Sequence, residues 1–224
     1  LTMKKSSVKE FENKRWREGS QAFVFRHQKA LEMVEKRQNV LDIACGDGLL
    51  LSALSQKGVR VSGVDISEEG VKKCREKGLN ASVVDVATEN LPFQDGAFDT
   101  VIMLDVLEHV YTPEALLREA VRVSKKYIII SVPNFNSLPA RLQVLRGDVP
   151  ENNRPNKGHV YWFNYSVLRK MTEDGGLSLV EVRMNTFWQN HFFIGTISKF
   201  MTKIWPSLFA LSFVVKLEKL KLAR

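Results

Sequence analysis

Cysteine is scarce in this sequence. Only Cys45 and Cys74 occur among 224 residues, too few for a disulfide framework or for a zinc site built on cysteine ligands. A chain of this length can bury a core large enough to fold without such crosslinks. The cysteine content is therefore typical of a reducing compartment, and we expect a cytoplasmic protein.

Long apolar runs are lacking too. The longest, 208–215, is far shorter than the about 20 residues that span a bilayer. Residues 1–16 contain no apolar stretch of about 7–15 residues such as a secretion signal carries. We expect neither a transmembrane segment nor a signal peptide.

Several ligand-binding signatures are absent. No G-x-x-x-x-G-K-[ST] loop occurs, which disfavours ATP. The dinucleotide fingerprint G-x-G-x-x-G is incomplete, because Leu51 occupies its third glycine position, and this disfavours NAD. No N/D-P-P-Y motif or aromatic-basic array indicates a nucleic-acid partner. No His/acid spacing indicates a metal, so we expect none.

The charge that is present is positive. The net charge is +8, and lysine and arginine concentrate partly at both ends of the chain. Solvated tails explain this in the simplest way. Contact with an anionic substrate or with a membrane surface is the alternative.

Short apolar runs alternate with helical segments through the first two thirds of the chain. Strands are predicted at 39–44, 59–66, 81–86, 98–104 and 127–132. Helices of ordinary length separate most of them, which implies parallel pairing with right-handed crossovers. The strands are apolar almost throughout, so both faces of the sheet are covered. The predicted fold class is doubly wound α/β.

The regular alternation of strands and helices is not found outside this region. Helices are predicted at 20–37, 137–146 and 166–174, a polar loop at 147–158, and further strands at 177–184 and 209–217. An aromatic insertion, 187–206, precedes the last strand. We expect a single domain consisting of an N-terminal helical lid (1–37), a core (38–185), and the insertion with the last strand (186–224).

A glycine turn follows the first predicted strand in the stretch VLDIACGDG, residues 40–48. Its glycines permit close approach of a ligand, and the helix that follows offers free N–H groups. Asp65 ends the second strand, where an acid binds ribose hydroxyls, and Asp85 ends the third, where one can accept an adenine amine. Asp42 lies beside the turn and can face an amino group. The pattern predicts a pocket for an adenosine with a zwitterionic tail.

Five motifs in order, DIACGDG, GVDIS, VVDV, LPFQDGAFDTVIMLDVLEHV and YIIISVPN, resemble class I methyltransferases that depend on S-adenosylmethionine (SAM). SVPNFNSLPARLQVLRGDVP is similar to the methionine-biosynthesis methyltransferase-like group. The resemblance covers roughly residues 38–185. It implies a Rossmann-like, mostly parallel seven-stranded sheet, SAM as cofactor and S-adenosylhomocysteine as product.

The resemblance also implies a residue-by-residue cofactor site. Asp42 orients the amino group of SAM, Asp65 binds the ribose, and Asp85 with the backbone of Val86 holds the adenine. The remaining expected lining residues are Ala44, Cys45, Gly46, Gly48, Ile66, Met103, Leu104 and Asp105. Cys45 has a second interpretation, as a small filler beside the turn.

The acceptor side is less defined. His109, which follows the fourth strand, and His159, which begins the aromatic segment HVYWFNY, are the candidate catalytic bases, although His109 can equally be structural. Trp16, Phe23 and Phe25 are candidates for a lid over SAM, with ordinary helix packing as the alternative. The 187–206 insertion is interpreted as a cap over the acceptor, and otherwise as a homodimer interface or a peripheral membrane surface.

These observations predict direct methyl transfer from SAM to a small-molecule or lipid-linked acceptor. One rival is a SAM-binding, methyltransferase-like partner or regulator without transfer activity. The other is an NAD-linked or nucleotide-sugar enzyme of similar fold. The sequence contains no feature that identifies the acceptor.

Overall fold

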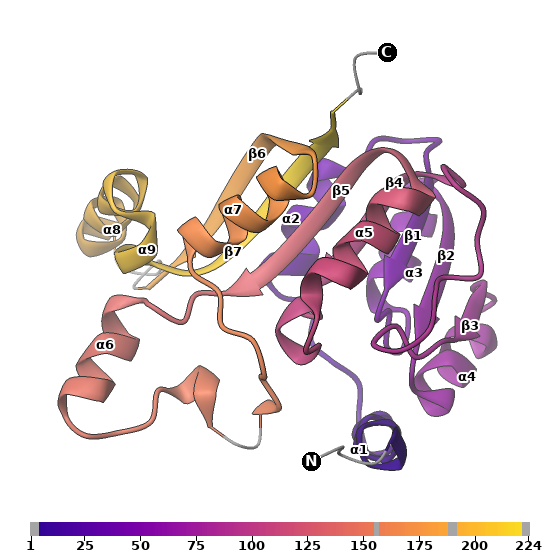
Figure 1. Cartoon of the computed structure of the whole chain (residues 1–224), viewed down its shortest axis with the longest axis horizontal. Coiled ribbons are helices and arrows are strands. Elements are labelled where there is room, and N and C mark those ends of the chain that lie inside the picture. The colour runs from indigo at the N-terminus through magenta and orange to yellow at the C-terminus, as the bar shows by residue number, and fades with distance from the viewer. Residues whose placement is uncertain (1–4, 155–156, 188–191, 221–224) are drawn as a thin grey trace. The chain divides into compact units, whose positions relative to one another are not determined.

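The computed structural model describes residues 5–154, 157–187 and 192–220 (Figure 1). Within these ranges seven strands form one sheet with the order β3-β2-β1-β4-β5-β7-β6. The described residues form two compact units, the first made of residues up to 104 with 119–128, the second of residues 105–118 and those from 129 onward. No helix in the described ranges has the length and apolar character needed to cross a membrane.

The first unit carries parallel strands. They are β1 (Asn39–Ile43), β2 (Arg60–Asp65), β3 (Ala81–Val83) and β4 (Phe98–Leu104). β1 pairs with β2 on one side and β4 on the other, and β2 pairs with β3. Helices α1 (Lys5–Glu18), α2 (Phe25–Met33), α3 (Leu49–Gln56) and α4 (Glu68–Glu76) accompany them, and α5 (Pro113–Val123) is shared between the units.

The strand order reverses at β1. Because β2 and β4 lie on opposite sides of it, the chain turns one way after β1 and the other way later, and the carboxyl end of the strand at such a switch point is where open α/β sheets bind ligands. Val40, Leu41 and Ile43 are fully buried, as expected for a strand covered on both faces. The predicted doubly wound class is confirmed.

The second unit contains the antiparallel end of the sheet. Its elements, besides the second half of β5 (Ser124–Pro133), are η1 (Leu107–His109), α6 (Leu138–Leu145), η2 (Glu151–Asn153), α7 (Tyr165–Asp174), β6 (Leu177–Thr186), α8 (Phe192–Ile204), α9 (Pro206–Phe209) and β7 (Ala210–Lys219). β6 and β7 pair antiparallel, with two register shifts. The predicted insertion contains α8, and the last strand begins one residue later than predicted.

Two further predictions differ in detail. β3 ends at Val83 rather than at residue 86, because the chain turns after Val84 donates its N–H to the Asp65 carbonyl at 2.9 Å. The N-terminal region forms two helices, α1 and α2, where one was predicted at 20–37. α1 is rich in charge and is held on α4 by ion pairs, Lys9–Glu68 at 2.6 Å among them.

Candidate functional site

The glycine turn joins the end of β1 to the start of α3. Ala44, Gly46 and Gly48 all have positive φ, at 62°, 55° and 77°. Gly48 is the N-cap of α3, so the turn leads directly into the helix N-terminus, where unpaired N–H groups are available to an anionic group. Ala44 is exposed, and its left-handed conformation is uncommon for a residue with a side chain.

Both glycines are required by packing as well as by φ. A Cβ on Gly46 would lie 2.2 Å from a ring carbon of Trp16, and one on Gly48 would lie 2.7 Å from Leu79. The indole of Trp16, which is only 6% exposed, therefore lies directly on the turn. Of the three aromatic residues predicted as a lid, Trp16 packs on the glycine turn and the ring of Phe23 packs on His27, and the lid over SAM stays a prediction.

Asp65 links the glycine turn to the start of α4. One carboxylate oxygen accepts the Gly46 N–H at 2.8 Å, and the other accepts the Ser67 N–H at 2.8 Å. Ser67 caps α4 by accepting the Gly70 N–H. The carboxylate thus lies at the carboxyl end of β2, where the sequence predicts a ribose ligand.

The electrostatics of Asp42 and Asp65 are unusual. Burial raises the pKa of Asp42 to about 8, and the nearby charge of Asp65 adds to the effect. Burial also raises the pKa of Asp65 to about 6, although its two backbone N–H bonds oppose the shift. Each carboxyl retains a proton more readily than a solvated one because little positive charge compensates it. A cationic ligand would stabilise the ionised pair.

Two buried polar atoms near the turn have no hydrogen-bond partner among the described residues. They are Asp47 Oδ1 and Trp16 Nε1. The other carboxylate oxygen of Asp47 lies 3.3 Å from Lys77 Nζ, which also donates to the Asp47 carbonyl. Buried polar groups are normally paired, so a ligand or a water is expected here. Asp47 is not among the residues predicted from the sequence, although its place between two glycines indicates a position at the turn.

Cys45 belongs to the core through its side chain and to the turn through its backbone. Its thiol packs with Leu51, Val71 and Cys74. A hydrogen bond with Cys74, together with burial, raises the pKa of the Cys45 thiol, so it stays protonated and is a poor nucleophile. The filler interpretation agrees with this packing. Ile66, directly after β2, is half-buried.

Asp85 and Val86 lie in the turn after β3 rather than in the strand. The Asp85 carboxylate accepts the Ala87 N–H at 3.2 Å and the Thr88 hydroxyl at 2.8 Å. Both oxygens thus have local donors, and each retains lone-pair capacity. The adenine role of this pair stays a prediction.

The three residues predicted at the end of β4 differ in exposure. Met103 is fully buried opposite Ile43, and Leu104 is half-buried. Asp105, in the second unit, has a φ of 52°. Its N–H donates to the Ser131 carbonyl at 3.1 Å, and its carboxylate accepts the Ser131 hydroxyl.

The second unit brings the two predicted catalytic histidines together. His109 and His159 have ring centroids 4.8 Å apart, at an angle of 72°. Possible ligand atoms of Glu108, His109 and His159 all lie within 4.8 Å of one another. The backbone carbonyl of Glu108 accepts the N–H groups of Val160 and Tyr161, which holds the aromatic segment against η1.

Hydrogen bonds orient both rings. His109 Nδ1 lies 3.2 Å from the Gly158 carbonyl, which only accepts, so we assign the proton to Nδ1 and a lone pair to Nε2. Burial and the neighbouring His109 lower the pKa of His159, while a hydrogen bond to the Asn152 backbone opposes the shift. A neutral imidazole held in this way is able to accept a proton or bind a divalent cation. The sequence alone predicts no metal site here, because Glu108 and His109 lie far from His159 along the chain and the three residues follow no recognisable ligand spacing.

His27 lies in the first unit. It is buried, and its Nδ1 accepts the Val24 N–H at 3.2 Å. His191 lies outside the described residues.

The chain is similar to a known protein family and to several methyltransferases. A family model described as "Methionine biosynthesis protein MetW" matches residues 25–212. A ubiquinone biosynthesis O-methyltransferase of Chromobacterium violaceum is 31% identical over 151 residues, which cover 63% of this chain and 65% of that protein. One from Xanthomonas oryzae pv. oryzae is 36% identical over 106 residues, covering 45% and 44%. The chain thus spans less than two thirds of the length of these relatives.

Solved structures share the fold. Magnesium protoporphyrin IX methyltransferase from Synechocystis PCC 6803, solved with bound S-adenosylhomocysteine, is 22% identical with a TM-score of 0.67, and the match covers 96% of this chain and 99% of that one. One chain of a complex between the Haloferax volcanii Trm112 methyltransferase activator and a methyltransferase gives a TM-score of 0.63 at 19% identity, and the match covers 98% of this chain and 99% of that one.

Proposed function

Since the chain belongs to the family of the methionine biosynthesis protein MetW and has the fold of class I SAM-dependent methyltransferases, we propose that it binds SAM and transfers the methyl group to a small-molecule or lipid-linked acceptor. The observation that carries this proposal is the pair of buried carboxyl groups, Asp42 and Asp65, at the glycine turn.

Charge selects SAM over a dinucleotide. SAM has a sulfonium and an ammonium group, and either would stabilise the ionised forms of Asp42 and Asp65. The two phosphates of NAD would instead add negative charge beside two carboxyls whose pKa values burial already raises. Leu51 at the third fingerprint position supports the same choice.

We propose that the cofactor is held by the residues that the family resemblance implies. Asp42 faces the amino group, Asp65 accepts from the ribose hydroxyls, and Asp85 with Val86 contacts the adenine. The backbone of the glycine turn borders the methionine end. Trp16 Nε1 and Asp47 Oδ1, the two buried atoms near the glycine turn that have no hydrogen-bond partner among the described residues, supply one further donor and one further acceptor.

The acceptor is a hydroxyl group. The named activity of the curated relatives is O-methylation, and an oxygen acceptor must lose its proton. SAM would supply the methyl group, and Nε2 of His109, which the sequence predicts as a base, would take the proton of the acceptor hydroxyl. The Gly158 carbonyl and the ring of His159 position that imidazole. The stacked rings of Phe135 and Trp162, 5.7 Å apart, form an aromatic wall beside His159.

A non-catalytic role is the second candidate. The family description refers to methionine biosynthesis and not to methyl transfer, which favours a SAM-binding partner of another enzyme. Such a protein would retain the cofactor site and show no turnover.

Calorimetry with SAM, S-adenosylhomocysteine and NAD tests the proposal. We expect both adenosyl compounds to bind and NAD not to. Asp65→Ala should weaken SAM binding by about tenfold or more, since it removes two charge-assisted hydrogen-bond acceptors. Asp174→Asn, an exposed surface acid, is the matched control. NAD binding without SAM binding would overturn the proposal. SAM binding with no methylation of any compound in a metabolite extract would favour the second candidate.

A further inference from the structure

Helix α8 exposes its large apolar side chains and buries small or polar ones, which is the reverse of an ordinary amphipathic surface helix. The side chains that face inward are small or polar, with Ser198 and Thr202 only 4% and 3% exposed and Gly195 also buried. Ile197 and Phe200 are each 62% exposed, and Ile204 is 50% exposed. A helix on a water-exposed surface normally buries its large apolar residues instead.

The exposed apolar residues form one continuous stripe. Positions 197, 200 and 204 follow the i, i+3, i+7 spacing of a single helix face. Trp205, 57% exposed, continues the stripe where α8 ends, and its ring stacks on Phe209 of α9 with centroids 6.5 Å apart. Figure 1 shows α8 and α9 together at one end of the β6–β7 pair.

The inward face of α8 packs within the second unit through small side chains. The Thr202 hydroxyl donates to the Ser198 carbonyl at 2.7 Å, a local bond of the helix itself. The small inward residues let α8 lie close to β6, which it contacts. The large apolar side chains of α8 are thus exposed, and their burial against another molecule or a membrane would be favourable.

The charges on α8 indicate which kind of partner would bury its exposed apolar side chains. Residues 182–217 contain no aspartate or glutamate, whereas Lys199 and Lys203 are exposed on α8. In a symmetric pair of chains these lysines would face like charges, with no acid from the same segment to neutralise them. Anionic lipid headgroups would neutralise them, and the acyl boundary would accept the apolar stripe.

We propose that α8 is an interfacial anchor: Ile197, Phe200, Ile204 and Trp205 insert at the headgroup boundary of an anionic bilayer while Lys199 and Lys203 contact phosphate. The helix lies on the membrane and does not cross it, since its 13 residues extend only about 20 Å against a hydrocarbon core of about 30 Å. Tryptophan at the edge of such a helix suits the interface.

Vesicle flotation tests the anchor. The full chain should float with vesicles of equal parts phosphatidylcholine and phosphatidylglycerol, and much less with phosphatidylcholine alone. Ile197→Ser/Phe200→Ser/Ile204→Ser should weaken binding on the order of a hundredfold, because three apolar side chains no longer insert. Leu179→Ser/Val180→Ser in β6 removes apolar side chains that are 46% and 51% exposed, and serves as the matched control.

The lysines are tested separately. Lys199→Gln/Lys203→Gln should weaken binding to the anionic vesicles by about fivefold per lysine and leave the weak binding to phosphatidylcholine unchanged. Tryptophan emission should shift to the blue on addition of anionic vesicles, and Trp205→Phe should remove that shift.

Three results would overturn the inference. They are wild-type protein that stays unbound, an α8 triple variant that floats like the wild type, and a triple variant that turns a dimer into a monomer without changing flotation. The last would make this face an interface between copies. The assay contains no SAM, so its failure leaves the proposed methyl transfer unaffected.

Discussion

At the scale of single residues, the unusual feature is a pair of carboxyls, Asp42 and Asp65, whose pKa values are raised by burial. The pKa of Asp42 is about 8 in the folded protein against 3.8 for an ordinary aspartate. The folded state therefore binds more protons than the unfolded state between these values. The stability that protonation of Asp42 contributes to the folded state is complete below about pH 4 and is lost as the pH rises through about 8. A bound cation would reverse this preference.

The affinity for SAM should therefore depend on pH. Binding of the cationic cofactor releases a proton from Asp42, so we expect affinity to rise between pH 6 and pH 8 by up to about tenfold per pH unit. Calorimetry in two buffers of different ionisation enthalpy measures the proton release directly. An affinity that is constant over this range, with no proton release, would contradict the assignment of Asp42.

Replacing Asp42 separates stability from binding. Asp42→Asn removes a buried charge at high pH, so the unliganded protein should melt at a higher temperature than the wild type at pH 8. It should bind SAM at least about tenfold more weakly and lose the pH dependence. Thermal melts with and without SAM measure both effects, and Asp174→Asn should change neither.

Gly46 and Gly58 allow a matched comparison. Both have positive φ, but a Cβ on Gly46 would meet Trp16, whereas none of the described atoms lies within 4 Å of one on Gly58. Gly58→Ala should lower the free energy of unfolding by about 1 kcal/mol, and Gly46→Ala by about 3 kcal/mol. Trp16→Ala in the Gly46→Ala background should recover part of the difference in a double-mutant cycle. Equal losses for the two glycines would argue against the Trp16 contact.

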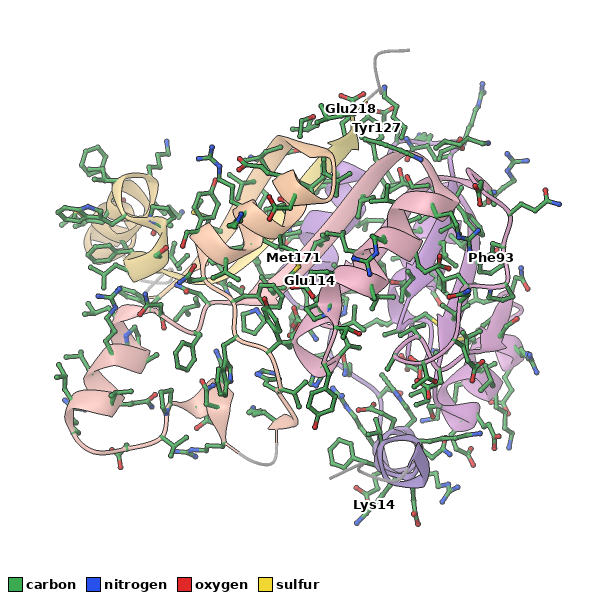
Figure 2. All side chains as sticks on the ribbon, in the orientation of Figure 1. Lys14, Phe93, Glu114, Tyr127, Met171 and Glu218 are labelled. Carbon is green, nitrogen blue, oxygen red and sulfur yellow. The ribbon has the colours of Figure 1, made fainter. Side chains whose placement is uncertain are left out.

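At the scale of elements, short segments between helices and strands carry the chemistry. The glycine turn unites β1, α3 and α4 through Asp65 and Ser67. In the second unit, η1 and the segment after η2 are joined by backbone bonds from Val160 and Tyr161 to Glu108. The Tyr161 hydroxyl also donates to Glu114 at 3.3 Å, the side chain labelled on α5 in Figure 2.

The cluster on η1 should bind a divalent transition metal if its ligand atoms close to bonding distance. Two imidazoles and a carboxylate suit Zn²⁺ or Co²⁺. At a hundredfold excess over its dissociation constant, Zn²⁺ would stabilise the fold by about 2.7 kcal/mol, which a thermal melt detects. Glu108→Gln and His159→Gln should remove the effect, and Glu114→Gln should retain it. Unchanged melting of the wild type with Zn²⁺ would leave the cluster with a proton-transfer role alone.

At the scale of the whole molecule, the candidate cofactor site lies on the parallel strands, and the exposed apolar helix lies on the antiparallel strands. The parallel strands of the first unit end in the glycine turn and Asp65. The antiparallel pair β6–β7 of the second unit carries α8 and its exposed apolar stripe. Family membership rests on residues 25–212, which include both.

The sequence by itself determined the doubly wound class, the boundaries of β4, the glycine turn and the acids near the strand ends. These features depend on local periodicity and on turn chemistry, which neighbouring residues decide. Only the tertiary structure decided that Trp16 covers Gly46, that Asp47 is buried, that His159 reaches Glu108, and that α8 turns its apolar face outward. Each of these depends on side chains distant in the chain competing for the same space, and one sequence read locally contains no measure of that competition.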